Sequence, residues 1–193
     1  LVSAVGQVLE QVALLESKGI NKIILLDHAQ DFTGDPLSAQ SLHGIDIIVA
    51  AGSTGFMGNS PAQGPFNLLR AGDTPQAAYP TVREDSRGDT VLVVNSDQLY
   101  TYVGNLMVSF DAEGKILSVD GRSGPIASTT EAAHLLAAEL GIPVKPNAEV
   151  ARIFGLLKNT NLIEDQLGII GTTTATLNGA RADVRSRETN LGR

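Results

Sequence analysis

Asp27 and His28 directly follow an aliphatic run, Lys22-Ile-Ile-Leu-Leu26, that predicts a buried strand. In an open parallel sheet, ligands bind just beyond the carboxyl ends of the strands. A titratable imidazole at such a position can take part in chemistry, so His28 is a candidate functional residue. The alternative, a histidine that only forms a hydrogen bond at a strand end, stays open.

A small polar segment, Gly52-Ser53-Thr54-Gly55, follows a second aliphatic run at 45–50. If the two strands are parallel neighbours, this segment and His28 lie at the same edge of the sheet. Backbone amides of such a segment can bind phosphate, although it lacks a nearby lysine and does not match a P-loop. The pattern therefore predicts a small-ligand site without naming the ligand.

Other candidate ligands carry less information. Asp31 and Asp35 lie near Asp27 and could help to bind a hard cation, but they are also typical turn and helix-cap residues. His43 and His134 fall on predicted helices, where we expect ordinary surface or helix-end residues.

The amino-acid composition excludes several classes of function. Fourteen Lys and Arg against 21 Asp and Glu give a net charge of -7, and a surface of that sign repels nucleic acid. The chain has no cysteine, which excludes disulfides and thiol catalysis. No apolar run reaches the roughly 18 residues that a membrane span needs. With 193 residues we expect one domain, or one domain with a piece of another.

Both ends of the sequence suggest a longer parent. Position 1 is Leu, and the last residues, Arg187 to Arg193, form no recognisable termination signal. Our hypothesis is that the chain is an excised piece of a longer polypeptide.

The elements that position His28 follow from periodicity. Spacing predicts a helix at 3–18, a strand at 22–26, a helix at 36–43 that begins at Asp35 and Pro36, and a strand at 45–50. This alternation predicts parallel strands joined by right-handed crossovers. Residues 51–80 are rich in Gly, Pro, Ser and Asn, so we expect a functional or partly ordered loop.

In the second half of the chain, the hydrophobic pattern changes to a period of two, which is typical of strands. Alternation predicts strands at 90–95, 100–110 and 115–119, with a hairpin turn at Asp111–Gly114. A helix is expected over 128–140, with Ser128 and Glu131 as a capping box and Gly141 as its stop. Beyond Pro146 we expect a helix at 148–166 and then a hairpin made of strands at 168–177 and 180–185.

Read in order, several segments carry a family resemblance: "GINKIILLDHAQ", "LHGIDIIVAAGST", "YPTV", "VLVVNSDQLYTYVGNLMVSFDAEGKI" and "LNGARADVRSRETNLG". The chain resembles the two-domain metallophosphoesterases, which include bacterial 5'-nucleotidases and their alkaline-phosphatase-like relatives. The resemblance implies an α/β fold, half of a calcineurin-like α/β/β/α sandwich with a mixed sheet, then a linker helix and a hairpin. It assigns 1–145 to the metallophosphoesterase domain, 146–166 to the linker helix and 167–193 to the start of the 5'-nucleotidase C-terminal domain.

The resemblance also implies roles for particular residues. His28 matches a metal-binding histidine, and Gly52 falls where the family usually has another ligand. Ser53 and Thr54 match the phosphate-pocket loop, and Arg185 matches an arginine that helps to bind the nucleotide. The resemblance implies that the family's Asp-x-His, Gly-Asp and Gly-Asn-His-(Asp/Glu) motifs, which furnish most metal ligands and the catalytic acid, lie upstream of this sequence, so we expect no catalytic residue in this chain.

The function implied is a fragment of a metal-dependent phosphomonoester hydrolase, a 5'-nucleotidase or alkaline-phosphatase-like enzyme, that uses water activated by two metal ions. The ions would be divalent, with Zn, Mn, Mg and Ca not distinguished. Implied partners are a nucleotide or other phosphomonoester, and the complementary N-terminal part of the protein or a second copy. The resemblance also implies a secreted or periplasmic protein. The alternative function is a non-catalytic binding or assembly module that needs a complementary chain.

Overall fold

A computed structural model describes residues 4–28, 39–53, 55–59, 66–97, 99–159 and 172–190. The chain divides into two compact units, residues 1–145 and 146–193, and each is described by itself. The assignment of these segments to functional domains stays a prediction.

The first unit is built on a four-stranded sheet in the order β1-β2-β4-β3. Its strands are β1 Ile24–Asp27, β2 Ile47–Ala50, β4 Thr90–Val94 and β3 Thr81–Glu84. β1, β2 and β4 run parallel, whereas β3 pairs antiparallel with β4. The predicted α/β class with a mixed sheet is therefore confirmed.

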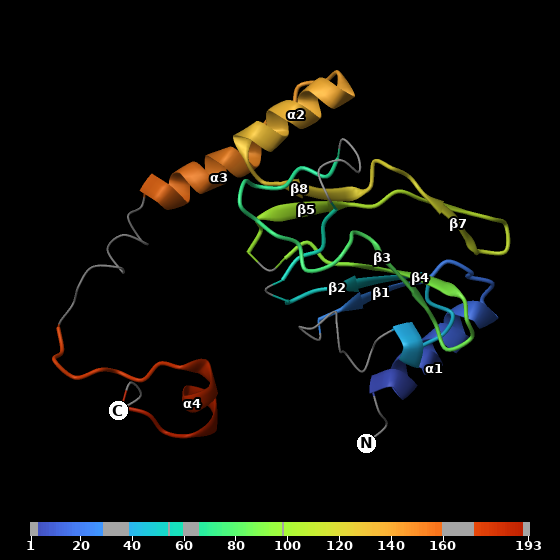
Figure 1. The fold of residues 1–193 in the computed structure, drawn as a ribbon, viewed down its shortest axis with the longest axis horizontal. Coiled ribbons are helices and arrows are strands. Elements are labelled where there is room, and N and C mark those ends of the chain that lie inside the picture. Colours follow the sequence, from blue (N-terminus) through green and yellow to red (C-terminus); the bar gives the residue numbers. More distant parts are fainter. Residues whose placement is uncertain are drawn as a thin grey trace. The chain divides into compact units, whose positions relative to one another are not determined.

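Helix α1, Ala4–Ser17, packs on one face of this sheet through Val12, which is almost fully buried. Figure 1 shows α1 on one side of the sheet and the strands β5 to β8 on the other. The core lies between these layers and is made of aliphatic side chains from β2, β4 and their surroundings, among them Leu42, Ile48, Val91 and Leu92. Burial of such side chains is the main favourable contribution to folding.

The remaining strands of the first unit form two antiparallel pairs. β5 Tyr102–Asn105 pairs with β8 Gly124–Ala127, and β6 Val108–Phe110 pairs with β7 Ile116–Val119. The predicted strand 100–110 is therefore two strands, which separate at Leu106 and Met107 because β5 and β6 have different partners. The predicted turn at Asp111–Gly114 is confirmed, since Asp111 N donates to Lys115 O at 3.0 Å.

The described parts of the predicted loop 51–80 form no helix and no extended strand. They are nevertheless packed, because Met57, Phe66 and Tyr79 are buried. Isolated bridges join Met57 to Ala77 and Leu68 to Ile126. The segment is therefore an irregular but integral part of the first unit.

Two predicted helices differ from the structure. The helix at 36–43 lies largely outside the described residues, and its described part is a single 3₁₀ turn, η1 Ala39–Ser41. The second is α2, Thr130–Leu140, whose N-cap is Thr129 instead of Ser128, because the Thr129 hydroxyl accepts the Ala132 N–H. Its C-terminal stop at Gly141 is confirmed by a left-handed φ of 67°.

The second unit contains α3, Ala148–Asn159, and a short helix α4, Arg181–Ser186. The rest of the helix predicted to 166 lies outside the described residues. The predicted hairpin is wrong, because Arg181–Ser186 is helical and the described residues 172–177 form no strand. Asn178 explains the difference: its side chain accepts the Ala180 N–H at 3.0 Å and donates to Asp183 at 2.7 Å, which starts a helix.

Candidate functional site at the carboxyl edge of the sheet

His28 lies directly beyond the carboxyl end of β1, as the sequence predicts. The parallel register pairs Asp27 with Ala50, and Ala51 N donates to Asp27 O at 2.7 Å. His28 and the segment after β2 therefore share one edge of the sheet. The His28 side chain is exposed, and the described residues give it no hydrogen-bond partner, so its imidazole is accessible to a ligand.

The segment after β2 turns sharply at this edge. Gly52 has a φ of 83°, in the left-handed region that favours glycine, which gives a backbone reason for glycine at this position. The Ser53 hydroxyl accepts the Gly55 N–H at 3.2 Å, so it helps to close the turn. Thr54 lies outside the described residues.

Asn95 follows the carboxyl end of β4 and is a residue of this edge that sequence reasoning missed. It is 3% exposed, and its side-chain amide donates to Gly55 O at 2.8 Å. Its side-chain oxygen accepts the Asp97 N–H at 3.1 Å. Asn95 therefore ties the turn after β2 to the loop after β4. Asn95 could have been found from the sequence, because it is a polar residue that directly follows the aliphatic run Val91–Val94. The same pattern, a polar residue directly after an aliphatic run, identified Asp27.

A cavity of about 340 Å³ runs along the sheet from Ile24 and Ile47, where β1 and β2 begin, to Ala51 and Asn95 at this edge. Its walls are mainly aliphatic residues of β1, β2 and β4, with Asn95, Ser96 and Asp97 among its polar lining residues. Tyr79 also lines the cavity, and burial raises the pKa of its phenol to about 12. The phenol therefore stays neutral at physiological pH. This arrangement combines an apolar surface with a few polar groups, as is common in small-molecule sites.

Among the described residues, His28 is the candidate ligand at this edge. No group of three or more His, Cys, Asp or Glu side chains gathers anywhere in the portions of the chain that the structure describes. His28 fits as a single imidazole ligand, because it is exposed at the edge where the turn after β2 also lies. Asp27 is 8% exposed and already has an interaction partner. Asp31 and Asp35 lie outside the described residues.

The other candidate residues are placed elsewhere. His43 lies beside Arg87, with its Nε2 atom 3.4 Å from Arg87 Nη2. His134 is exposed on α2. Arg185 is exposed on α4 in the second unit, so it is described separately from His28 and Ser53.

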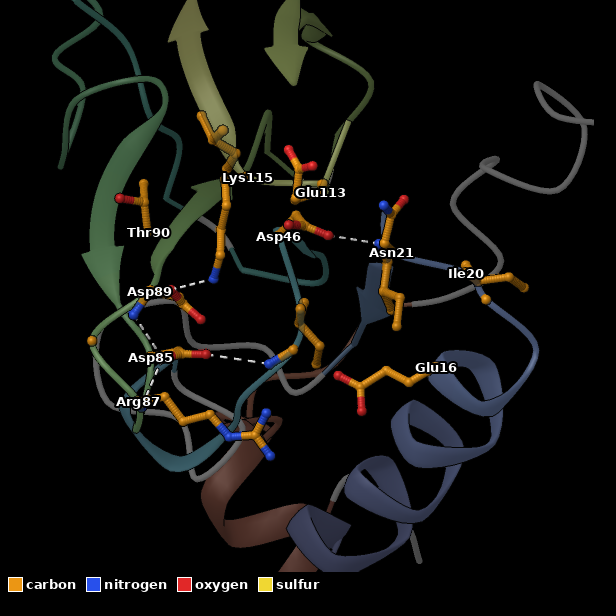
Figure 2. A pocket seen from close by; sticks show the side chains of 17 residues that line it. Glu16, Ile20, Asn21, Asp46, Asp85, Arg87, Asp89, Thr90, Glu113 and Lys115 are labelled. Atoms are coloured by element: carbon orange, nitrogen blue, oxygen red, sulfur yellow. Dashed lines mark hydrogen bonds and ion pairs between the residues drawn. The ribbon is translucent and has the colours of Figure 1, made fainter. Parts of the chain in front are cut away.

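A second cavity, of about 450 Å³, lies at the opposite edge, where β2 and β4 begin. Figure 2 shows its acidic side chains and Lys115, whose Nζ atom is 2.5 Å from Asp89 Oδ1. Asp46 accepts the Ile23 N–H at 2.7 Å, and burial raises the pKa of Asp46. Asp46 and the Lys115–Asp89 pair therefore join neighbouring segments of this cavity.

Asp85 makes the clearest structural contribution at this opposite edge. Burial opposes ionisation of its carboxyl group, but hydrogen bonds from the backbone N–H groups of Asp89, Arg87 and Gly44 hold its pKa below the usual value. A carboxylate that accepts three backbone donors joins the turns that carry them. We therefore regard the opposite edge as structural and the carboxyl edge as the candidate site.

Comparisons with known proteins identify relatives of this chain. A 5'-nucleotidase from Diplobatis ommata is 29% identical over 187 residues, which cover 94% of this chain and 27% of that relative. A snake venom 5'-nucleotidase from Naja atra is 32% identical over 179 residues, covering 92% of this chain and 29% of that relative. The predicted resemblance to 5'-nucleotidases is confirmed. No family model matches the chain.

A solved structure shows the same resemblance to 5'-nucleotidases. A 5'-nucleotidase precursor from Thermus thermophilus superposes with a TM-score of 0.63 and 28% identity, covering 98% of this chain and 33% of that structure. The chain therefore spans about a third or less of the length of these relatives. Within the described residues, no helix has both the length and the apolar character that a membrane crossing requires.

Proposed function

We propose that this chain is part of a metal-dependent phosphomonoester hydrolase that acts on nucleotides. The proposal rests mainly on the alignment of 94% of the chain with a 5'-nucleotidase. The placement of His28 and the turn after β2 at one edge supports it, because this edge is where open parallel sheets bind ligands.

In this proposal His28 is a ligand of one divalent ion. Its exposed imidazole at the carboxyl edge fits that role, and imidazole favours transition metals such as Zn or Mn over Mg or Ca. Bound divalent ions would lower the pKa of a water molecule toward neutrality and offset charge on the phosphate. Two ions per complete site are proposed by resemblance.

The polar groups around His28 would bind the substrate. Ser53 and Thr54 would line the phosphate pocket, where the left-handed turn at Gly52 exposes the backbone. Arg185 would contact the nucleotide, because a guanidinium stays charged and can bind two oxygen atoms at once. The structure describes Arg185 and the edge in separate units, so this contact is an expectation from the resemblance.

The remaining ligands and the catalytic groups would come from polypeptide outside this chain. The aligned relatives are more than three times as long as the matched stretch, which leaves ample sequence for them. A second copy of the chain remains a proposed partner, but it would carry the same residues. The net charge of -7 disfavours nucleic acid as a partner.

Phosphate release from 5'-AMP by the natural polypeptide that carries this chain tests the proposal. We expect turnover with Mn²⁺ or Zn²⁺ that EDTA abolishes, and no turnover by the 193-residue chain alone. The Arg185→Ala variant should raise KM for 5'-AMP while the exposed Arg83→Ala variant leaves it unchanged. A folded, metal-supplied protein that hydrolyses no phosphomonoester would contradict the proposal.

A second candidate function is a non-catalytic binding or assembly module. It is favoured by the single imidazole that the described residues bring to the edge. The same assay separates the two functions, because the module would bind a complementary chain without turnover under any metal condition.

We also propose that the protein is exported. The relative from Naja atra is named as a venom protein, and a chain without cysteine is compatible with an oxidising compartment. Fractionation of the source cells tests this, and recovery of the protein only in the cytoplasmic fraction would oppose it.

A further inference from the structure

A cavity of about 890 Å³ is formed by the segment 67–75, the first two turns of α2 and a few neighbouring residues. Among the described residues, it shares none of its lining with the cavities at the two edges of the sheet. Its volume lies in the range of about 300–1,000 Å³ that is typical of small-molecule sites. The proposed hydrolysis reaction uses none of its lining residues.

Aliphatic side chains line this cavity from two parts of the chain. Leu68, Leu69 and Pro75 contribute from the segment 67–75, and Ala132 and Leu135 contribute from α2. Leu135 is 59% exposed, so part of this apolar surface is in contact with water. A ligand with an apolar body would remove this surface from water, which favours binding.

Hydrogen bonds hold the segment 67–75 in place. Asn67 is 6% exposed, and its side-chain oxygen accepts the Asn59 N–H at 2.9 Å while its side-chain amide donates to Asn59 O. Leu68 N donates to Pro125 O at 2.9 Å, and Leu68 O accepts the Ala127 N–H at 2.8 Å. The cavity is therefore preformed, and a ligand would not have to order its walls.

Three charged side chains line the cavity, and two of them offset each other. Arg70 Nε donates to Asp73 Oδ2 at 2.8 Å, and the Tyr102 hydroxyl donates to the same oxygen at 2.5 Å. These hydrogen bonds, that of Tyr102 first, hold the pKa of the Asp73 carboxyl below its ordinary value. Glu131, the third, is exposed and has no side-chain partner among the described residues. The cavity therefore carries one uncompensated negative charge.

The position of Glu131 also has a structural benefit. It lies in the first turn of α2, where a carboxylate stabilises the helix N-terminus. This effect needs only its charge near the first turn. Its carboxylate oxygens stay able to accept a hydrogen bond from a ligand.

We propose that this cavity binds an amphipathic amine, with an apolar body against the aliphatic walls and a protonated amino group at Glu131. The charge balance selects this occupant. An acid of the same shape would bring a second negative charge to Glu131, while Arg70 is already bound to Asp73. The inference goes beyond the proposed hydrolase function and does not depend on it, because its test measures binding without turnover.

Isothermal titration calorimetry on the natural polypeptide that carries this chain tests the proposal with two probes, octylamine and octanoate. They have the same chain length, and at pH 7 the first is a cation and the second an anion. Octylamine should bind saturably, with the negative heat-capacity change that apolar burial produces. It should bind at least about fivefold more tightly than octanoate, as expected for one accessible ion pair gained or one repulsion added.

Two pairs of variants on α2 locate the binding. Glu131→Gln should remove the preference for octylamine, whereas Glu139→Gln, at an exposed position outside the cavity, should keep it. Leu135→Ser should weaken octylamine binding about fivefold or more, whereas Leu140→Ser should not. Leu140 is 46% exposed and does not line the cavity. All four positions are exposed, so the variants should fold normally.

Three results would overturn the inference. Failure of octylamine to bind saturably would mean that the cavity is not a site for amines. Octanoate binding as tightly as octylamine would remove the role of Glu131. Equal effects of Leu135→Ser and Leu140→Ser would place the bound probe outside this cavity.

Discussion

Replacing His28 with alanine should lower hydrolysis of 5'-AMP by the natural polypeptide that carries this chain more than about 100-fold, because loss of groups that only orient ligands already costs 10–100-fold. Folding should be nearly unaffected. The side chain is exposed, and surface substitutions usually change the free energy of unfolding by no more than about 0.5 kcal/mol. Steady-state kinetics and urea unfolding measure the two effects on the same sample.

The His134→Ala variant is the matched control, since His134 is an exposed histidine on α2 away from the carboxyl edge. It should retain full activity. If His28→Ala lost activity only in proportion to its unfolded fraction, His28 would be a structural residue at a strand end and not a ligand.

The second large effect is expected at Asn95. Alanine there removes the partners of Gly55 O and the Asp97 N–H from a residue that is 3% exposed. Because each buried group left unpaired costs about 1–3 kcal/mol, we expect a total loss of about 2–4 kcal/mol in the free energy of unfolding. Urea unfolding of the full chain measures this loss.

Asn105 provides the control for Asn95. It also donates a side-chain hydrogen bond, to Arg122 O at 2.7 Å, but near the surface where water can replace it. Asn105→Ala should therefore cost less than about 1 kcal/mol. Equal losses in the two variants would mean that Asn95 does not hold the turn after β2 and the loop after β4 together.

The position of the candidate site could be predicted from the sequence because its signal is local and strong. The aliphatic runs become two strands whose α/β connection makes them parallel. β2 is buried as predicted, but the prediction of a buried strand is wrong for β1, because β1 is the terminal strand of the described sheet and exposes Ile24 and Leu26. The carboxyl ends of both strands then lie at one edge, which places His28 near the turn at Gly52. Asn95 follows β4 in the same way and could have been predicted by the same reasoning.

Other features depend on contacts that the sequence pattern does not contain. β3 and β8 are four residues long and include Arg83, Glu84 and Pro125, so they form strands because of their partners and not by alternation. The helix α4 replaces a predicted strand through the contact of Asn178 with Asp183. The adjacent hydroxyl residues Ser128 and Thr129 left the start of α2 uncertain by one residue.

The central claim is that the imidazole of His28 binds a divalent ion at the carboxyl edge. The most direct measurement is a crystal structure of the natural polypeptide that carries this chain, grown with Zn²⁺ and measured at the zinc absorption edge. The account predicts an anomalous peak about 2.0–2.1 Å from a ring nitrogen of His28. An anomalous peak held entirely by other residues, with the His28 ring facing solvent, would contradict it.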